Sequence, residues 1–209
     1  MPRLIRRRKI SVNAIEPIQP QRPRRLLAEA LRTAIYMLVL LMISSTLVAR
    51  YRIEQTSMEP NIHPGQRVIV SQAGRTIGSW FNRSAYAAHS TSAAAAGLQH
   101  GQIVIFYETD DLSQSPLIKR LIGLPGDTVA IHDGATYINN VRIPEPYLSV
   151  STECSNYCNL TLDTNEYYFM GDNRSVSRDS RLFGPIPGDH VIGRVVLRFW
   201  PLDQMTLFP

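Results

Sequence analysis

Residues 128–143 read TVAIHDGATYINNVRI, and this stretch decides the fold class. Its apolar runs are short, rich in β-branched and aromatic residues, and bounded by turn residues, which is typical of strands. Asp133-Gly134 is a strong signal for a two-residue β-hairpin, and Asn139-Asn140 is a second, weaker one. The stretch therefore predicts antiparallel strands at 128–132, 136–138 and 141–143.

The same pattern continues on both sides of this stretch. It predicts further strands at 51–54, 67–71, 102–107, 117–122, 167–170 and 191–200. The fold class is therefore expected to be mainly β, with an antiparallel sheet domain at residues 50–209. Residues 73–100 fit poorly and predict a loop-rich insertion, either a loose loop or a short helix. Whether this insertion is plain surface, or places Trp80-Phe81 against a substrate or membrane headgroups, is left open.

Residues 26–49 form a different kind of segment, rich in Leu, Ile, Val and Met, with Glu29 and Arg32 as the only charged residues. Its uncharged part, residues 33–49, has 17 residues, which is near the minimum for a helix that spans a bilayer. We therefore expect one transmembrane helix at 26–49. The alternative is a cleavable signal peptide ending near Val48-Ala49, which the long basic segment before the apolar part disfavours.

The charge is unevenly distributed along the chain. Of 209 residues with a net charge of +5, residues 1–32 hold nine basic and two acidic ones, and the remaining 177 hold 13 basic and 15 acidic ones. A nucleic-acid binder would carry its basic patch on the folded domain, so the pattern favours contact with an anionic membrane surface. The basic excess predicts a cytoplasmic tail at 1–25 and an extracytoplasmic domain at 50–209.

Cys154 and Cys158 are the only cysteines. The sequence around them lacks the further ligands of a zinc site. They form either a disulfide that closes a small loop in an oxidising compartment or two free thiols.

Ser57 lies a few residues beyond the apolar segment, in residues 55–60, QTSMEP. A serine needs a neighbouring base to act as a nucleophile, and otherwise it commonly caps a local turn. None of the five histidines lies in a Gly-rich elbow or has an obvious acidic partner, and Ser57 lacks the Gly-x-Ser-x-Gly frame. A Ser-His triad is therefore disfavoured.

Lys119 is the better candidate base, because it interrupts the apolar run of residues 117–122, where Leu117 and Leu121 share its face. Burial there would lower its pKa and raise the fraction of neutral amine at pH 7. The alternative is a charge on a sheet edge that blocks aggregation.

Four segments carry a family resemblance. They are SMEP at 57–60, HGQIVIF at 100–106, KRLIGLPGD at 119–127 and GDNRSVSRDSR at 171–181. In this order, behind an apolar segment, they resemble the sequence boxes of the type I signal peptidases, or leader peptidases, of bacteria and organelles. The similarity runs over most of residues 30–200.

The resemblance implies a membrane-bound serine endopeptidase that removes N-terminal signal peptides from exported preproteins, cutting after small residues in Ala-x-Ala-like sites. It implies that Ser57 is the nucleophile and Lys119 the general base of a Ser/Lys dyad. Ser177 matches a serine that hydrogen-bonds and orients the lysine, and Asp179 and Arg181 match a supporting charged pair. No metal or organic cofactor is implied.

The resemblance also implies an oxyanion hole made by the backbone N–H of Ser57 and a side chain two residues earlier, here Gln55. Many family members have a hydroxyl at that position, so the role of Gln55 stays open. Asn61 and Gln102 are milder departures, and the single span replaces the two that are frequent in the family.

The expected partners are preprotein signal peptides, the lipid bilayer and, as a further candidate, the secretion translocon, at the plasma membrane. Two other functions compete. A self-cleaving repressor with the same dyad would be cytosolic and carry a DNA-binding head. An inactive membrane-anchored binding module would have broken Ser and Lys boxes, and here both boxes are intact.

Overall fold

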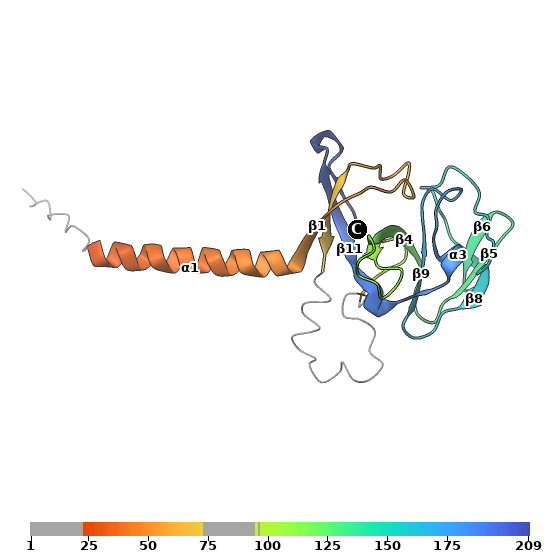
Figure 1. The fold of residues 1–209 in the computed structure, drawn as a ribbon, viewed down its shortest axis with the longest axis horizontal. Helices are drawn as coiled ribbons and strands as arrows, with labels where there is room; N and C mark the ends of the chain where they lie inside the picture. Colours follow the sequence, from red (N-terminus) through yellow and green to blue (C-terminus); the bar gives the residue numbers. More distant parts are fainter. Residues whose placement is uncertain (1–22, 73–94, 96) are drawn as a thin grey trace, which may run out of the picture. The chain divides into compact units, whose positions relative to one another are not determined.

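The structure is a computed structural model, and it describes residues 23–72, 95 and 97–209. Within the first helix, side chains are described for residues 27–39. The chain divides into two compact units, Met1–Leu41 and Met42–Pro209, and all strands belong to the second (Figure 1). Most of the predicted basic tail, residues 1–25, lies outside the described residues.

Helix α1, Pro23–Leu47, occupies the apolar segment for which a helix at 26–49 is expected. The helix ends earlier than predicted, because Val48 and Ala49 already pair with a strand of the sheet. Strand β1, Val48–Arg52, accordingly starts before the strand predicted at 51–54. Among the residues described, no helix combines the length and the apolar character needed to cross a membrane.

The larger sheet has eight strands in the order β1-β2-β11-β3-β4-β9-β10, with β12 paired to β11. Each neighbouring pair is antiparallel. The bounds after β1 are β2 Arg67–Ser71, β3 Ile103–Phe106, β4 Leu117–Gly123, β9 Glu166–Met170, β10 Ile186–Pro187, β11 Val191–Trp200 and β12 Thr206–Leu207. Strand β4 therefore lies inside the sheet, between β3 and β9.

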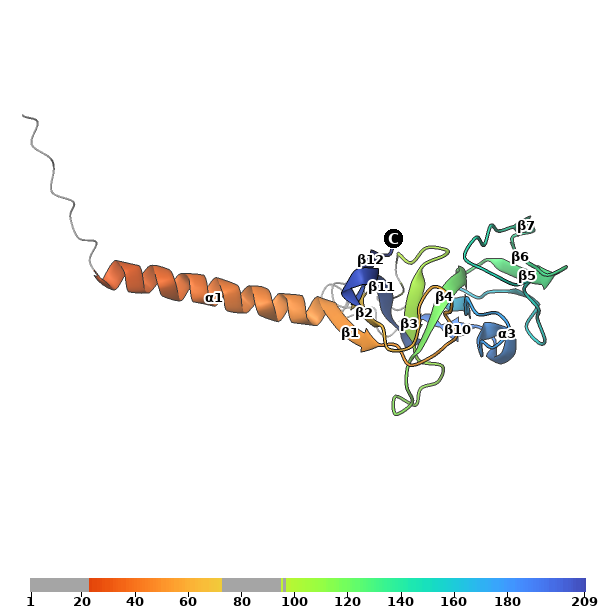
Figure 2. The same ribbon diagram turned by 90° about the horizontal axis from the view of Figure 1, so that it is seen from above.

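The smaller sheet confirms both hairpins predicted from residues 128–143. Asp133 and Gly134 have φ values of 51° and 73°, and Asn139 and Asn140 have values of 51° and 66°. Both pairs therefore adopt the left-handed backbone that a two-residue type I′ turn requires. The strand order is β7-β6-β5-β8, with bounds β5 Thr128–His132, β6 Ala135–Ile138, β7 Val141–Arg142 and β8 Asn159–Thr161. Figure 2 labels the first three of these strands, β7, β6 and β5.

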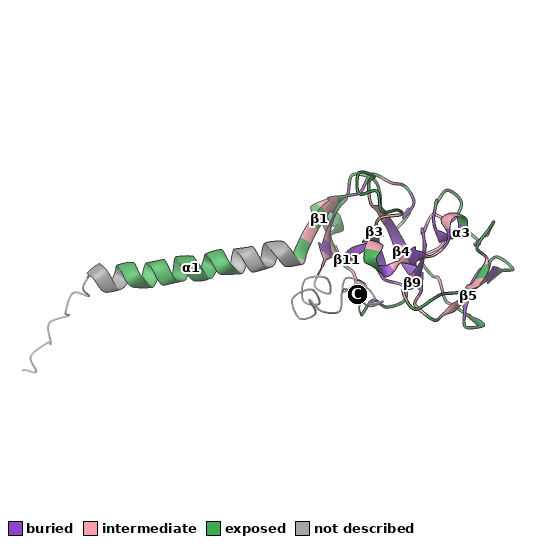
Figure 3. Ribbon diagram, turned by 60° about the horizontal axis from the view of Figure 1, so that its bottom comes forward, coloured by how far each residue is buried: buried purple, intermediate pink, exposed green. Residues whose placement is uncertain are grey.

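The mainly β prediction is confirmed, and buried residues concentrate in β3, β4, β9 and β11 (Figure 3). The sequence did not predict β8, β10 and β12, because runs of two or three residues are too short to show a strand period. The remaining elements are short, namely helix α3 Ser180–Phe183 and the 3₁₀ helices Gly188–His190 and Leu202–Gln204.

The predicted insertion at 73–100 is described only at its end. Residues 73–94 and 96, which include Trp80-Phe81, lie outside the described residues. Ala95 and Leu98 are buried in a core cluster with Phe106 and Phe169. Ala95 and Leu98 thus contribute to the core of the domain.

Candidate active site

Ser57 lies in a turn that the hydrophobic core holds in place. The N–H of Glu59 donates to the Thr56 carbonyl at 3.2 Å, and the N–H of Ile62 donates to the Met58 carbonyl at 2.9 Å. Met58 and Ile62 are fully buried in one core cluster. Because these neighbours anchor the turn, the position of Ser57 is fixed by packing rather than by its own side chain.

Lys119 lies in the middle of β4 and is 2% exposed. Leu117 and Leu121 share its face, as predicted, and Val104 of β3 pairs directly opposite it. The alternative of a lysine on a sheet edge is wrong, because β4 is an interior strand. Its Nζ lies 2.6 Å from Ser57 Oγ in a buried hydrogen bond, which joins two residues 62 positions apart in sequence.

Burial lowers the pKa of Lys119 to about 8. The cause is the loss of hydration of the charged amine, and nearby Asp179 and Glu108 partly oppose it by attracting that charge. About a tenth of the amines are therefore neutral at pH 7. A neutral amine next to a hydroxyl can accept its proton.

Gly171 allows the Ser57 turn and the loop of residues 171–181 to meet. A Cβ atom at this position would lie 2.5 Å from the Ser57 carbonyl oxygen and 2.2 Å from Ser177 Oγ. The neighbouring Asn173 N–H donates to the same Ser57 carbonyl at 3.0 Å. The glycine is therefore required by the space available between these groups.

Ser177 lies beside this contact but does not hydrogen-bond Lys119, which differs from the role that the family resemblance implies. Its Oγ is buried and has no hydrogen-bond partner among the described residues. Lys119 Nζ instead bonds Ser57. Ser177 Oγ thus lies next to Gly171, close to the site. It can still form a hydrogen bond, because it has none within the described residues.

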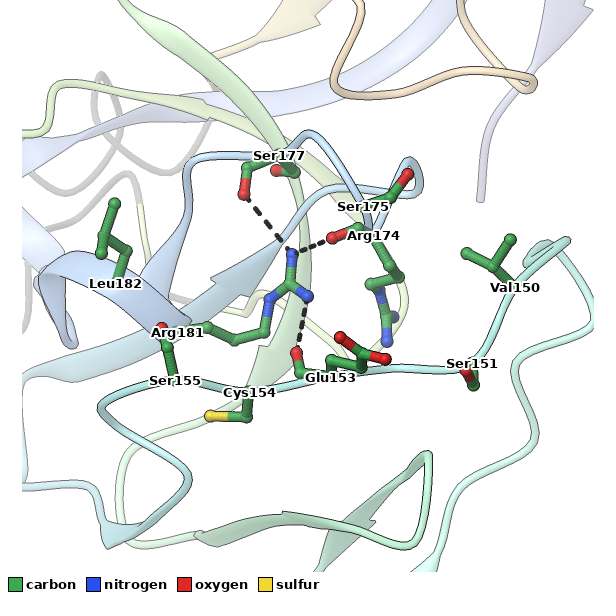
Figure 4. A pocket seen from close by; sticks show the side chains of 10 residues that line it. All are labelled: Val150, Ser151, Glu153, Cys154, Ser155, Arg174, Ser175, Ser177, Arg181 and Leu182. Carbon is green, nitrogen blue, oxygen red and sulfur yellow. Dashed lines mark hydrogen bonds between the residues drawn. The ribbon is translucent and has the colours of Figure 1, made fainter.

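Asp179 and Arg181 form a buried, two-pronged ion pair, with Nε to Oδ1 and Nη2 to Oδ2 both at 2.9 Å. The second oxygen of Asp179 also accepts from the Gly171 N–H at 2.9 Å. The guanidinium of Arg181 lines a cavity of about 420 Å³ and donates to the carbonyls of Glu153, Arg174 and Ser177 (Figure 4). The pair therefore holds the loop of residues 171–181 to the end of β9.

The structure joins Cys154 and Cys158 by a disulfide. The loop that the disulfide closes contacts the ion pair, because the Tyr157 N–H donates to the Arg181 carbonyl at 3.3 Å. The chain just before the disulfide also contributes the Glu153 carbonyl that Arg181 binds. The disulfide loop therefore packs against the segment that carries Asp179 and Arg181.

A buried carboxylate that the sequence left without a role, Asp172, links two of the boxes with Asn61, the residue that follows the box at 57–60. It accepts two hydrogen bonds from Arg120, at 2.7 and 2.6 Å, and one from Asn61 at 2.9 Å. Arg120 also stacks on the ring of Tyr147, with 3.9 Å between its guanidinium carbon and the ring centroid. The sequence offered one signal for this contact: Arg120 is a charged residue in an apolar strand, and a buried charge needs a partner.

Gln55 is not bonded to Ser57. Its amide nitrogen donates to the Pro116 carbonyl at 3.4 Å, and its amide oxygen is buried without a partner among the described residues. One hydrogen of the amide nitrogen is thus directed to the start of β4. The second hydrogen has no recorded acceptor within the described part of the chain.

Four histidines, for which the sequence showed no obvious acidic partner, have one in the structure. His63, His100, His132 and His190 each lie within 3.3 Å of a carboxylate oxygen, and His89 is outside the described residues. His100 and His190 are 27 and 80 positions from their carboxylates, which the sequence could not reveal, whereas His63 and His132 pair with a residue four positions away or adjacent. None of these four histidines bonds Ser57, whose hydroxyl is instead bonded to Lys119 Nζ. In the described residues, no group of three or more His, Cys, Asp and Glu could hold a metal ion.

The chain is similar to known proteins of one family. A family model described as signal peptidase, peptidase S26, matches residues 26–200. Signal peptidase IB of Staphylococcus aureus (strain COL) is 30% identical over 190 residues, covering 82% of this chain and 87% of the relative. A probable signal peptidase I-2 of Synechocystis is 31% identical over 163 residues, covering 76% and 66%. A signal peptidase I crystal structure from Enterococcus faecalis has 33% identity and a TM-score of 0.39, covering 46% of this chain and 95% of that chain.

Proposed function

Because the chain belongs to the type I signal peptidases, the serine peptidases of family S26, we propose that it removes signal peptides with a Ser57–Lys119 dyad. The observation that carries the proposal is the 2.6 Å hydrogen bond between a buried lysine and a serine in a rigid turn. No other described side chain near Ser57 has a recorded bond to its hydroxyl. The two groups are thus in the contact that proton transfer needs.

In this proposal the neutral Lys119 amine takes the Ser57 hydroxyl proton as Oγ attacks the carbonyl carbon of the scissile bond. An ester forms to Ser57, the peptide C–N bond breaks, and the lysine gives its proton to the leaving amine. Lys119 then takes a proton from a water molecule as its oxygen attacks the ester carbonyl; the bond to Ser57 Oγ breaks, and Lys119 returns the proton to Oγ. Atoms and charges balance without a metal or an organic cofactor.

The tetrahedral intermediate carries a negative oxygen, and we assign its stabilisation to the backbone N–H of Ser57. This N–H donates to no recorded carbonyl within the described residues. The second amide hydrogen of Gln55 is the candidate for the other donor, since the first is directed to Pro116. Asp179 and Arg181 would hold the loop against Ser57, and Ser177 would use its unpartnered Oγ to orient the lysine when the enzyme turns over.

The proposal predicts cleavage after small residues. A preprotein with an Ala-x-Ala site should be cut by the purified chain directly after the second alanine, as read by mass spectrometry of the products. Replacing either alanine by Phe should reduce the cleavage rate at least about tenfold, because a closely packed pocket accepts no added volume. Equal cleavage of the Phe substrates would contradict the specificity, and no cleavage of any preprotein would contradict the activity.

We also propose that the apolar part of α1, residues 26–47, anchors the enzyme in the plasma membrane, with the tail at 1–25 in the cytoplasm and residues 48–209 outside, near the bilayer and the translocon. The large apolar side chains described in α1 are exposed, for example Leu27 at 76% and Leu31 at 62%. Protease added to intact spheroplasts should digest the domain and spare a tag on the N-terminal tail. Protection of the domain, with loss of the tag, would contradict this topology.

A further inference from the structure

One ion pair connects the two loops that flank Lys119, and the mechanism above gives it no role. Arg178 Nη2 lies 2.6 Å from Glu108 Oε1. Glu108 follows β3, and Arg178 belongs to the loop that follows β9. Because β3 and β9 are the two neighbours of β4, the pair connects segments that leave the sheet on either side of the lysine strand.

The register of the sheet places this bridge at the end of β4 that carries Lys119. Phe106, the last residue of β3, pairs with Leu117, and Met170, the last residue of β9, pairs with Arg120. Both strands run antiparallel to β4, so both loops leave at its N-terminal end. Lys119 lies between these two pairings.

The segment that carries Glu108 follows directly from the strand that lies opposite the lysine. Val104 lies opposite Lys119, and side chains two positions apart point to one face of a strand. Val104 and Phe106 therefore share the face of Lys119, and Glu108 lies in the bend two residues beyond Phe106. Its side chain is only 15% exposed, whereas that of Arg178 is 66% exposed.

The charged groups that act on Lys119 are Asp179 and Arg181 of the loop that follows β9, and Glu108 of the loop that follows β3. The Ser57 turn adds an uncharged hydroxyl. Asp179 is neutralised by a buried arginine through two hydrogen bonds. Glu108 is neutralised by an arginine that is open to solvent, so its effective charge depends on a contact that water, salt or a bound substrate can weaken.

We propose that Glu108 and Arg178 are positioning residues of the active site. Glu108 stabilises the protonated form of Lys119, and Arg178 reduces that stabilisation by forming an ion pair with the Glu108 carboxylate. This inference rests on the proposed function, in which the neutral lysine is the base. It adds that the charges of Glu108 and Arg178 adjust how readily Lys119 loses its proton. Neither residue hydrogen-bonds Ser57 or the Lys119 amine within the described part of the chain.

The pair is tested by the pH dependence of kcat/KM, whose acidic limb reports the ionisation of the free enzyme. Glu108→Gln should move this limb down by roughly half a unit to one unit, because a negative charge near the amine is lost. Arg178→Gln should move the limb to higher pH by a smaller amount, because the Glu108 carboxylate then lacks its ion-pair partner. The double variant should behave like Glu108→Gln, since Arg178 acts only through Glu108.

The measurements use the full chain in detergent, a fluorogenic peptide with an Ala-x-Ala site, and the exposed Arg142→Gln of β7 as the matched control, with no shift expected. Thermal melting checks that each variant is folded. In a Ser57→Ala background, NMR titration of the Lys119 Cε should show the same order of pKa values without any need for activity.

Superimposed profiles of wild type, Glu108→Gln and Arg178→Gln would overturn the inference while leaving the proposed function intact, provided that Lys119→Met is inactive. A double variant whose acidic limb differs from that of Glu108→Gln alone would also overturn the inference, because Arg178 would then act without Glu108. An active Lys119→Met enzyme would instead overturn the proposed function.

Discussion

Cleavage of a preprotein is expected to fall by at least about 1,000-fold when Ser57 is replaced by Ala or Lys119 by Met. The first change removes the attacking oxygen, and the second keeps a long apolar side chain in a buried site but removes the base. Because the two residues act as one unit, the double variant should be no worse than either single variant. Rates are read from single-turnover cleavage of a preprotein with an Ala-x-Ala site.

The matched control is Ser113→Ala, an exposed serine whose recorded bonds are to Asp111 alone. It should cleave at the wild-type rate. Near-normal cleavage by Ser57→Ala or Lys119→Met would show that another pair of residues carries the reaction. The melting temperature of Lys119→Met should not fall, because a buried amine is replaced by a side chain that needs no hydration.

The same dyad determines the pH dependence. The base works in its neutral form, and burial sets the pKa of Lys119 to about 8, so activity should rise with pH and reach half of its plateau near pH 8. A histidine base would place that midpoint at about 6.5. The midpoint of the pH–activity curve of the wild-type enzyme therefore distinguishes a lysine base from a histidine base without any variant.

The sequence predicted those parts of the fold that depend on local pattern. Asp133-Gly134 and Asn139-Asn140 fixed two hairpins because few residue pairs tolerate the left-handed turn. Leu117 and Leu121 identified the buried face of Lys119 because side chains repeat every two residues along a strand. Both features depend only on residues that are close together in the sequence.

The sequence could not predict contacts that depend on which segments meet. Asp172 binds Arg120 and Asn61, which are 52 and 111 positions away, and no periodicity connects them. The partner of Glu108 is likewise 70 positions away. The end of α1 was misplaced for a related reason, because Val48 and Ala49 are apolar enough for a helix and become strand only through pairing with β2.

Gly171→Ala is expected to lower kcat by at least about 100-fold, with a loss of roughly 1–3 kcal/mol in the free energy of unfolding. The added methyl group would lie 2.5 Å from the Ser57 carbonyl oxygen, which is backbone and cannot rotate away. The turn that carries Ser57 must therefore shift. A shift of a few tenths of an ångström or more would disturb the 2.6 Å contact with Lys119.

Two further variants separate this effect from a general loss of stability. Gly126→Ala introduces strain at a φ of +85° but has no atom within 4 Å of the new methyl group, so it should lower the melting temperature and leave kcat unchanged. Ser177→Ala in the Gly171→Ala background removes Oγ, yet the contacts with Ser57 O and the Ser177 Cβ, at 2.5 and 2.6 Å, remain. This double variant should therefore be no more active than Gly171→Ala. Recovery of activity would mean that crowding of Ser177 Oγ, rather than displacement of the nucleophile, accounts for the loss.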